Sequence, residues 1–290
     1  MDHYTRWALI HLGLGMAAQV SGLFAKVHML VAFVYFLYVI IKNSNKNHEA
    51  LQAAAYMTGA EVFFRMTNAA PLYETGKYSV AGFLLLGILY QSIRRSAVVY
   101  LLYIALLLPS VLVTLSYFDP DFNVRTSVIF NLSGPITLGL AAIYCYSRPI
   151  SHEVFYRVME KLLFPILSTA VYVQFYSMSL EAQITGTGSN FALSGGFGPN
   201  QVSTILGLGS FVLFMRFFTK LKFKLNLLDA ALFLFVTYRA FLTFSRGGVF
   251  VAVVMMALLL VIIYLRQPVS FKATFGIKMI FVGGALLVAW

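Results

Sequence analysis

The chain of 290 residues is 60% hydrophobic and only 11% charged, and its formal net charge is +11. Soluble domains are closer to ~45–50% apolar and ~25% charged, so this composition excludes a soluble globule, whereas a lipid bilayer can surround so much apolar surface. The apolar runs are continuous rather than alternating, which excludes a barrel of transmembrane strands. Because the basic residues lie between these runs, the positive charge indicates membrane topology and not nucleic-acid binding.

The apolar runs predict an all-α protein, a polytopic transmembrane helix bundle of about ten or eleven spans, with a single transmembrane domain over residues 1–290. The first two spans form either a hairpin or one interrupted helix. No small-residue cleavage site follows the first run, so we expect the N-terminus to be retained. Because the chain stops inside an apolar run, we expect it to be truncated at the C-terminus. In chain order the predicted spans are 7–23, 27–41, 50–67, 80–93, 97–118, 125–146, 155–178, 201–219, 227–244, 249–265 and 275–290.

The loops between these spans alternate between basic and nearly uncharged, which predicts the side of the membrane on which each lies. Basic loops favour the cytoplasm, so the N-terminus is predicted to lie inside. The outer loops are then near 68–79, 118–125, 179–200 and 245–248. The basic residues of the predicted cytoplasmic loops are Lys42, Lys46, Arg94, Arg95, Arg148, Lys220, Lys222, Lys224, Arg266 and Lys272.

Charged residues in the third span and in the loop after it predict a polar region near the outer face. Glu61 and Arg65 are four residues apart, so they share one face of a helix. Charges at membrane depth pair with one another or line a cavity, so the two side chains form either a helix-packing ion pair or the wall of a site. Glu74 and Lys77 follow in the outer loop and are candidates for binding substrate.

The segment 194–203 is polar but uncharged and leads into an apolar run, which predicts the start of a helix at the outer face. Pro199 suits the first helical position, and the glycine before it is tolerated as a cap. The free N–H groups and the positive dipole end of such a helix bind phosphate. Pro199, Asn200 and Gln201 are therefore candidate substrate contacts. The alternative is a flexible loop before an ordinary helix.

Two arginines near the predicted outer boundary are the strongest candidates for chemistry. Arg239 lies inside a span and Arg246 lies at its edge, and their spacing of seven places both on one face if the helix continues. An intramembrane arginine is a functional hypothesis by default, and a guanidinium matches phosphate oxygens with a bidentate fork. Ser245 and Gly247 flank Arg246, where glycine permits close approach of a ligand. The alternative is that Arg246 extends toward lipid headgroups.

The remaining polar residues show no further chemistry. The five histidines are scattered and none pairs with acids at ligand spacing, so we expect no metal and no cofactor. Asp119 and Asp121 form an Asp-Pro-Asp turn, which is either a solvated loop or a place for a base or metal. The lone cysteine, Cys145, cannot form an internal disulfide, and we expect it to be a small buried hydrophobe.

The sequence Thr-Phe-Ser-Arg-Gly-Gly at 243–248 resembles the signature of the O-antigen ligase and O-antigen polymerase superfamily. The segment Gly-Phe-Gly-Pro-Asn-Gln-Val-Ser at 196–203 is similar to one found in its members, and Tyr-Glu-Thr-Gly-Lys-Tyr at 73–78 is similar to one bacterial subgroup. The resemblance implies an inverting glycosyltransferase without a metal. Its arginine maps onto Arg246, which would contact a diphosphate.

The resemblance also implies the partners and the place of action. The donor would be a glycan on undecaprenyl diphosphate, and the acceptor lipid A–core, a glycan chain or another acceptor. The chain would lie in the bacterial inner membrane, with its active site facing the periplasm or exterior. An acceptor hydroxyl would attack the anomeric carbon while Arg246 and Arg239 stabilise the leaving diphosphate, and Glu61 or Glu74 would serve as base.

Two other functions stay open. A flippase or transporter of lipid-linked glycans would need charged residues near mid-membrane on several helices, whereas the polar residues here favour the outer face. The other is a structural or sensory membrane protein without catalysis; a sensor should carry a soluble output domain, and no such segment stands in the sequence.

Overall fold

The computed structural model describes residues 2–116, 123, 128–178, 188–219 and 223–266. Within these ranges every regular element is a helix and there is no strand, so the all-α prediction is confirmed. Five helical stretches are long and apolar enough to cross a membrane, which defines a multi-pass membrane protein: Gly22–Asn43, Arg95–Thr114, His152–Met178, Pro199–Phe218 and Arg246–Arg266. The predicted span at 275–290 and the turn with Asp119 and Asp121 lie outside the described residues.

The chain divides into two compact units by its internal contacts. Unit 1 comprises Met1–Ser21 and Leu163–Trp290, and unit 2 comprises Gly22–Leu162. The division describes packing, so the prediction of one transmembrane domain over the whole chain stays a prediction. The two units are described separately below.

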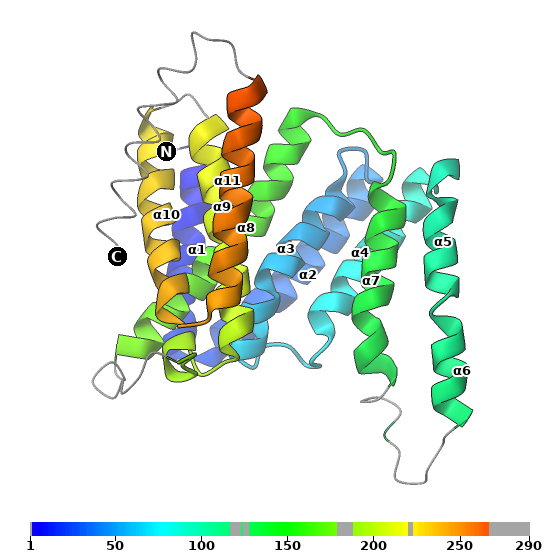
Figure 1. Ribbon diagram of the computed structural model, residues 1–290, viewed down its shortest axis with the longest axis horizontal. Helices are drawn as coiled ribbons and strands as arrows, with labels where there is room; N and C mark the ends of the chain where they lie inside the picture. The colour runs from blue at the N-terminus through cyan, green and yellow to red at the C-terminus, as the bar shows by residue number, and fades with distance from the viewer. Residues whose placement is uncertain (1, 117–122, 124–127, 179–187, 220–222, 267–290) are drawn as a thin grey trace. The chain divides into compact units, whose positions relative to one another are not determined.

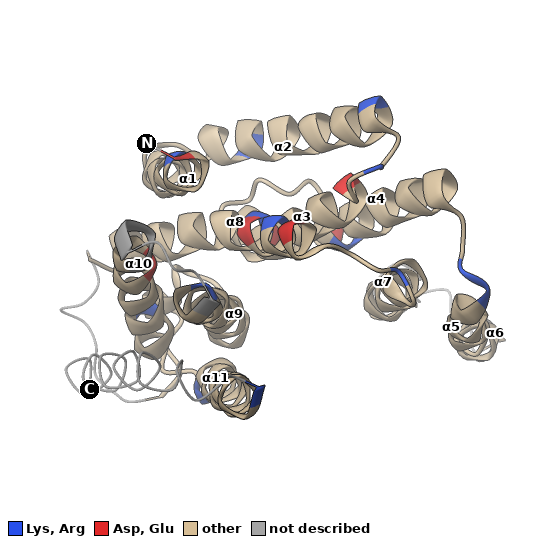
Figure 2. Ribbon diagram, turned by 90° about the horizontal axis from the view of Figure 1, so that it is seen from above, with Lys and Arg blue, Asp and Glu red and all other residues tan. Residues whose placement is uncertain are grey.

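Unit 1 is built from α1 (His3–Val20), the later part of α8 (His152–Met178), α9 (Pro199–Thr219), α10 (Phe223–Leu242) and α11 (Arg246–Arg266). Helix α9 packs against both α10 and α11, which touch each other much less (Figures 1 and 2). Helix α1 packs closely on α8, because a Cβ on Gly15 would lie 2.5 Å from the carbonyl oxygen of Ser168. The Ser168 hydroxyl donates to the His11 carbonyl at 2.7 Å and fixes this contact.

Unit 2 is built from α2 (Gly22–Asn43), α3 (Glu49–Met66), α4 (Thr75–Gln91), the short 3-10 helix η1 (Arg95–Ala97), α5 (Val98–Ala105), α6 (Leu108–Ser116) and α7 (Phe130–Cys145). Helix α3 packs against α2 and α4, and α7 packs against α4 and α5 (Figure 1). Aromatic rings fill the space between α2, α3 and α4, with Phe36 centred 5.1 Å from Tyr56 and 6.3 Å from Phe83.

The helix ends follow the sequence where a cap or a proline marks them. Helix α9 begins at Pro199, as predicted. The first two runs are separate helices, because Ser21 between them is extended. The predicted span 97–118 is broken into α5 and α6. Pro109 explains the break, since its nitrogen has no hydrogen to donate to the preceding turn.

Candidate functional site

The two segments that carry the family resemblance meet in unit 1, at what we call the α9–α11 junction (residues 198–204 and 243–248). The Ser203 hydroxyl donates to the Ser245 carbonyl at 2.9 Å, and the Ser245 hydroxyl donates to Asn200 Oδ1 at 2.7 Å. The Ser245 N–H in turn donates to Thr243 Oγ1 at 3.2 Å. Residues more than 40 positions apart are therefore fixed to one another by side-chain hydrogen bonds.

Glycine brings the two helices of this junction into backbone contact. A Cβ on Gly248 would lie 2.4 Å from the carbonyl carbon of Ser203, and one on Gly207 would lie 2.7 Å from the Gly248 carbonyl oxygen. Such distances leave no room for any side chain, so α9 and α11 touch through their backbones. Ser203 and Gly207 are small residues four apart on α9, and both lie at this contact within the chain.

The junction is open on the side of Arg246. This residue is the first of α11 and its side chain is exposed, while Gly247 beside it has no neighbouring atom within 4 Å of an added Cβ. Helix α9 starts at Pro199, and Asn200 in its first turn is bonded to Ser245, so the N-terminal ends of two helices meet here. Both ends carry unbonded N–H groups and a partial positive charge. Asn200 and Gln201 are exposed in the first turn of α9.

A groove of about 450 Å³ runs from this polar end along the seam between α9 and α11. Asn200, Thr204 and Ser245 line its polar end. Farther along, its walls are apolar and are formed by Leu208, Phe211, Val251, Ala252 and Met255.

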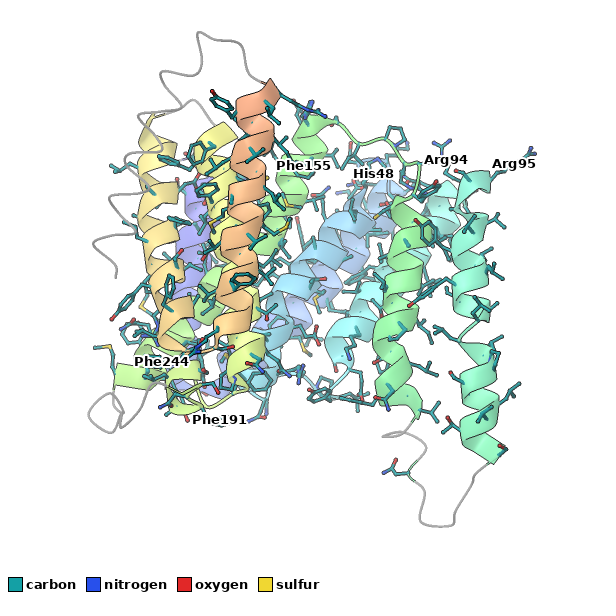
Figure 3. All side chains as sticks on the ribbon, viewed as in Figure 1. His48, Arg94, Arg95, Phe155, Phe191 and Phe244 are labelled. Carbon is teal, nitrogen blue, oxygen red and sulfur yellow. The ribbon has the colours of Figure 1, made fainter. Side chains whose placement is uncertain are left out.

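The turn before α9 is shaped by two glycines and an asparagine. Gly195 and Gly196 have φ of 73° and 69°, a conformation that L side chains rarely adopt. The Asn190 Oδ1 atom accepts from the Leu193 N–H at 3.2 Å, and the Asn190 N–H donates to the Thr243 carbonyl at 3.2 Å. These bonds hold the turn against the C-terminal end of α10 (Figure 3, where Phe191 and Phe244 mark the two segments).

Arg239 is fully buried, unlike Arg246. Its guanidinium donates to Gln174 Oε1 at 3.2 Å and to Ser177 Oγ at 2.7 Å, both on α8, and to the Leu193 carbonyl at 3.4 Å. Helix α10 ends at Leu242, so the condition for a shared helical face with Arg246 is not met. Arg239 therefore holds the turn before α9 against α8, through polar residues of α8 that the sequence reasoning did not single out.

The charged residues predicted near the third span lie in unit 2. Arg65 Nη1 is 3.5 Å from Glu61 Oε1, and the Arg65 guanidinium stacks 3.5 Å from the centre of the Tyr73 ring. Lys77 Nζ donates to Ser133 Oγ at 3.3 Å, and Glu74 is buried at the start of α4. These four charged residues gather at one end of unit 2, and the Glu61–Arg65 pair packs α3 against α4. A Cβ on Gly76 would lie 2.8 Å from Glu61 Cγ.

Unit 1 also contains a buried charged cluster that the sequence did not predict. Arg216 on α9 and Asp229 on α10 are fully buried, with Nε 3.3 Å from Oδ1. The Tyr4 hydroxyl donates to the same carboxylate oxygen at 2.5 Å, and its ring lies 3.7 Å from the Arg216 guanidinium. The available signal was one charged residue in the predicted run 201–219, Arg216, and an acid in the run 227–244, Asp229. Polar groups are therefore not confined to the predicted outer face.

One further expectation is corrected. Cys145 is exposed and not buried. It is the last residue of α7, where Ile143 and Tyr144 point to the core and the next position turns away. Within the parts of the chain that the structure describes, no group of three or more His, Cys, Asp or Glu residues could hold a metal ion.

These features define an all-α, multi-pass membrane protein with a polar junction at one end of a helix pair. No protein-family model matches the chain, and no curated protein or solved structure matches it.

Proposed function

We propose that the chain is a glycan transferase of the O-antigen ligase and polymerase type, which moves a glycan from undecaprenyl diphosphate to a lipid or glycan acceptor. The observation that carries the proposal is the α9–α11 junction. The two segments similar to that family, 196–203 and 243–248, are bonded to each other through Ser245, Ser203 and Asn200. Segments that share one task are expected to meet in space.

The chemistry of the junction supports a diphosphate ligand. Arg246 is exposed there, and the N-terminal ends of α9 and α11 add positive potential. The groove between the two helices continues from this polar end along apolar walls, which suits the chain of a lipid. In the proposed reaction an acceptor hydroxyl attacks the anomeric carbon, the bond to the diphosphate oxygen breaks, and Arg246 stabilises the charge on that oxygen.

Arg239 takes a positioning role in this proposal, because its donors contact protein oxygens and hold the turn that precedes α9. Glu61 and Glu74 remain proposed as bases for the acceptor hydroxyl, and Arg65, Glu74 and Lys77 as substrate contacts. These four belong to unit 2, and Arg246 belongs to unit 1. The site of transfer is proposed to face the exterior of the bacterial inner membrane.

The test is transfer by the purified full chain in proteoliposomes that contain an undecaprenyl-diphosphate-linked glycan and an acceptor. We expect Arg246→Ala to lower the rate of undecaprenyl diphosphate release by ~100-fold or more, since one stabilising donor of this kind is worth about that factor. Arg246→Lys keeps the charge but loses the fork, so its release rate should lie between those of the unmodified chain and Arg246→Ala.

Arg6→Ala is the matched control, because Arg6 is an exposed arginine of α1 and should leave the rate unchanged. Equal rates for the folded Arg246→Ala variant and the unmodified chain would remove the arginine from the mechanism. Absence of any transfer by the folded, unmodified chain would count against the function itself.

A further inference from the structure

Three turns of unit 2 that are far apart in the sequence are bonded together at one end of its helices. They follow α2 (43–48), α4 (92–95) and α7 (146–151). Asn45 is fully buried, and its side-chain amide donates to the Tyr144 hydroxyl at 3.0 Å while its Oδ1 accepts from the Ala50 N–H at 2.9 Å. The Gln91 side chain donates to the Asn45 carbonyl at 2.5 Å. We call this end the basic turn cluster.

Arg148 is fixed at the centre of the cluster. Its Nε donates to the Tyr144 carbonyl at 2.7 Å, its Nη2 donates to the Ser92 carbonyl at 3.0 Å, and its Nη1 donates to Gln91 Oε1. The guanidinium also lies 4.5 Å from the centre of the Tyr144 ring. A guanidinium has five N–H donors in a rigid fork, so a half-exposed arginine held by three of them still presents donors to a ligand without losing side-chain entropy.

The backbone of these turns is also held in an unusual form. A positive φ is uncommon for residues other than glycine and is kept only where the surroundings impose it. Most of the non-glycine residues with positive φ among the described residues lie in this cluster, namely Ser44, Asn45, His48, Ser92 and Ser147. The cluster is therefore a preformed surface and not a set of independent loops.

This surface is strongly positive. Lys42, Lys46, Arg94 and Arg95 are exposed around Arg148, and Figure 3 shows Arg94 and Arg95 at the same end of unit 2 as His48. The acid next to the cluster is Glu49, the first residue of α3. It is buried, and its carboxylate accepts hydrogen bonds from Asn43 Nδ2 at 2.9 Å and from the Asn47 N–H at 3.0 Å. The adjoining start of α8 adds Glu153 and Arg157, which offset each other.

The neighbouring apolar surface indicates which anion fits. Arg95 is followed within about two turns by Val98, Val99 and Leu102, whose exposed fractions are 54%, 69% and 59%. These side chains belong to a stretch long and apolar enough to span a membrane, so they face acyl chains. The Tyr100 and Tyr146 rings, 5.2 Å apart, lie beside them as aromatic residues do at the membrane interface. A ligand here would meet hydrocarbon on one side and fixed cations on the other.

We propose that the basic turn cluster binds the phosphate headgroup of an anionic phospholipid, such as phosphatidylglycerol, with Arg148, Arg94 and Arg95 as its phosphate contacts. Arginine forks match the non-bridging phosphate oxygens, and basic pockets between transmembrane helices bind anionic headgroups. The site is separate from the α9–α11 junction and does not depend on glycan transfer.

The test is native mass spectrometry of the full chain in detergent, titrated with dioleoyl phosphatidylglycerol or dioleoyl phosphatidylcholine. We expect tighter binding of phosphatidylglycerol. Each basic residue near a membrane surface is worth roughly a fivefold gain in binding, so Arg94→Gln/Arg95→Gln should weaken phosphatidylglycerol binding roughly 20- to 30-fold. Binding of phosphatidylcholine should not change, which also shows that the variant is folded.

Lys26→Gln/Arg266→Gln is the matched control, because it removes the same charge from two exposed residues outside the cluster. An equal loss of phosphatidylglycerol binding in this control would show that only the overall charge matters, and would overturn the site. Equal binding of both lipids, or no change in the arginine double variant, would overturn it as well. Displacement of the lipid by inorganic phosphate would identify a free-anion site instead and overturn the lipid assignment.

Discussion

The buried ion pair of Arg216 and Asp229 depends on single side chains from distant parts of the sequence. A charge in the membrane interior is costly unless it is paired and hydrogen-bonded. The pair is completed by Tyr4, which is 225 residues from Asp229 in the sequence. Hydropathy registers each charge only as a local dip in an apolar run, and cannot reveal a partner so far along the chain.

Asp229→Asn should lower the free energy of unfolding by about 3–5 kcal/mol, because it leaves the Arg216 guanidinium buried without its carboxylate. The double variant Arg216→Met/Asp229→Leu should be much less destabilised, since it removes both charges together. Reversible unfolding in mixed detergent micelles measures all the variants. A double variant as unstable as the sum of its single variants would contradict a coupled pair.

His48 gives the chain a defined dependence on pH. Burial in the turn between α2 and α3 lowers the pKa of His48 below its ordinary value of 6.5; the nearby charge of Arg148 lowers it further, and Glu49 opposes the shift. The unfolded chain therefore binds the proton more readily than the folded chain. The contribution of neutral His48 to the free energy of unfolding is therefore fully present above pH 6.5, and it is lost as the pH falls from there toward the lowered pKa.

We expect the thermal midpoint to fall between about pH 7.5 and pH 5.5, and to fall less in His48→Asn, which has no titrating ring. Asparagine suits this position because His48 has a φ of 58°. Its amide replaces the ring near the Tyr144 hydroxyl, which lies 3.4 Å from His48 Nδ1. The same pH dependence in both proteins would assign the effect to another group.

At the scale of elements, the sequence predicted most helices because hydrophobic runs and terminal residues act locally. Pro199 marks the first residue of α9, and the predicted span 249–265 matches α11 at Arg246–Arg266 within a few residues. The break between α5 and α6 was missed, although Pro109 marks it. The junction was predicted only as two separate motifs near the outer face, since hydrogen bonds between residues more than 40 positions apart leave no periodic signal.

Two adjacent glycines of α11 allow the effect of helix contact to be measured apart from the effect of a glycine-to-alanine change itself. Gly248→Ala should destabilise the chain by about 1–3 kcal/mol, because its methyl group would enter the backbone of α9 at Ser203 and force the helices apart. Gly247→Ala should change stability by less than about 0.5 kcal/mol, because nothing lies within 4 Å of its added Cβ. The two thermal midpoints provide the comparison. A Gly248→Ala variant as stable as Gly247→Ala would show that the helices are not in backbone contact.

At the scale of the whole molecule, composition predicted a membrane protein and the continuous apolar runs predicted helices, because the backbone groups of a helix bond within the segment itself. The orientation is still a prediction from the basic loops. It can be tested on either side of α4, where Leu72 before the helix and Ser96 in η1 after it are both exposed.

In a Cys145→Ser background, a cysteine at position 96 should react with a membrane-impermeant maleimide only from the cytoplasmic side, and a cysteine at position 72 only from the outer side. Labelling of intact cells against opened cells makes the distinction. Labelling of both positions from one side would mean that α4 does not cross the membrane. The reverse pattern would invert the predicted orientation.

Helix α11 touches its own unit along a narrow ridge that includes Gly248, Ala252 and Met256. Among the described residues, most of its other side chains are exposed, and its 21 residues give it a length of ~31 Å at 1.5 Å per residue, close to the thickness of a bilayer's hydrocarbon core. A thinner bilayer leaves apolar ends exposed and is accommodated by tilt. Acyl-chain length would therefore tilt α11 about this ridge and set how far Arg246 stands from the membrane surface.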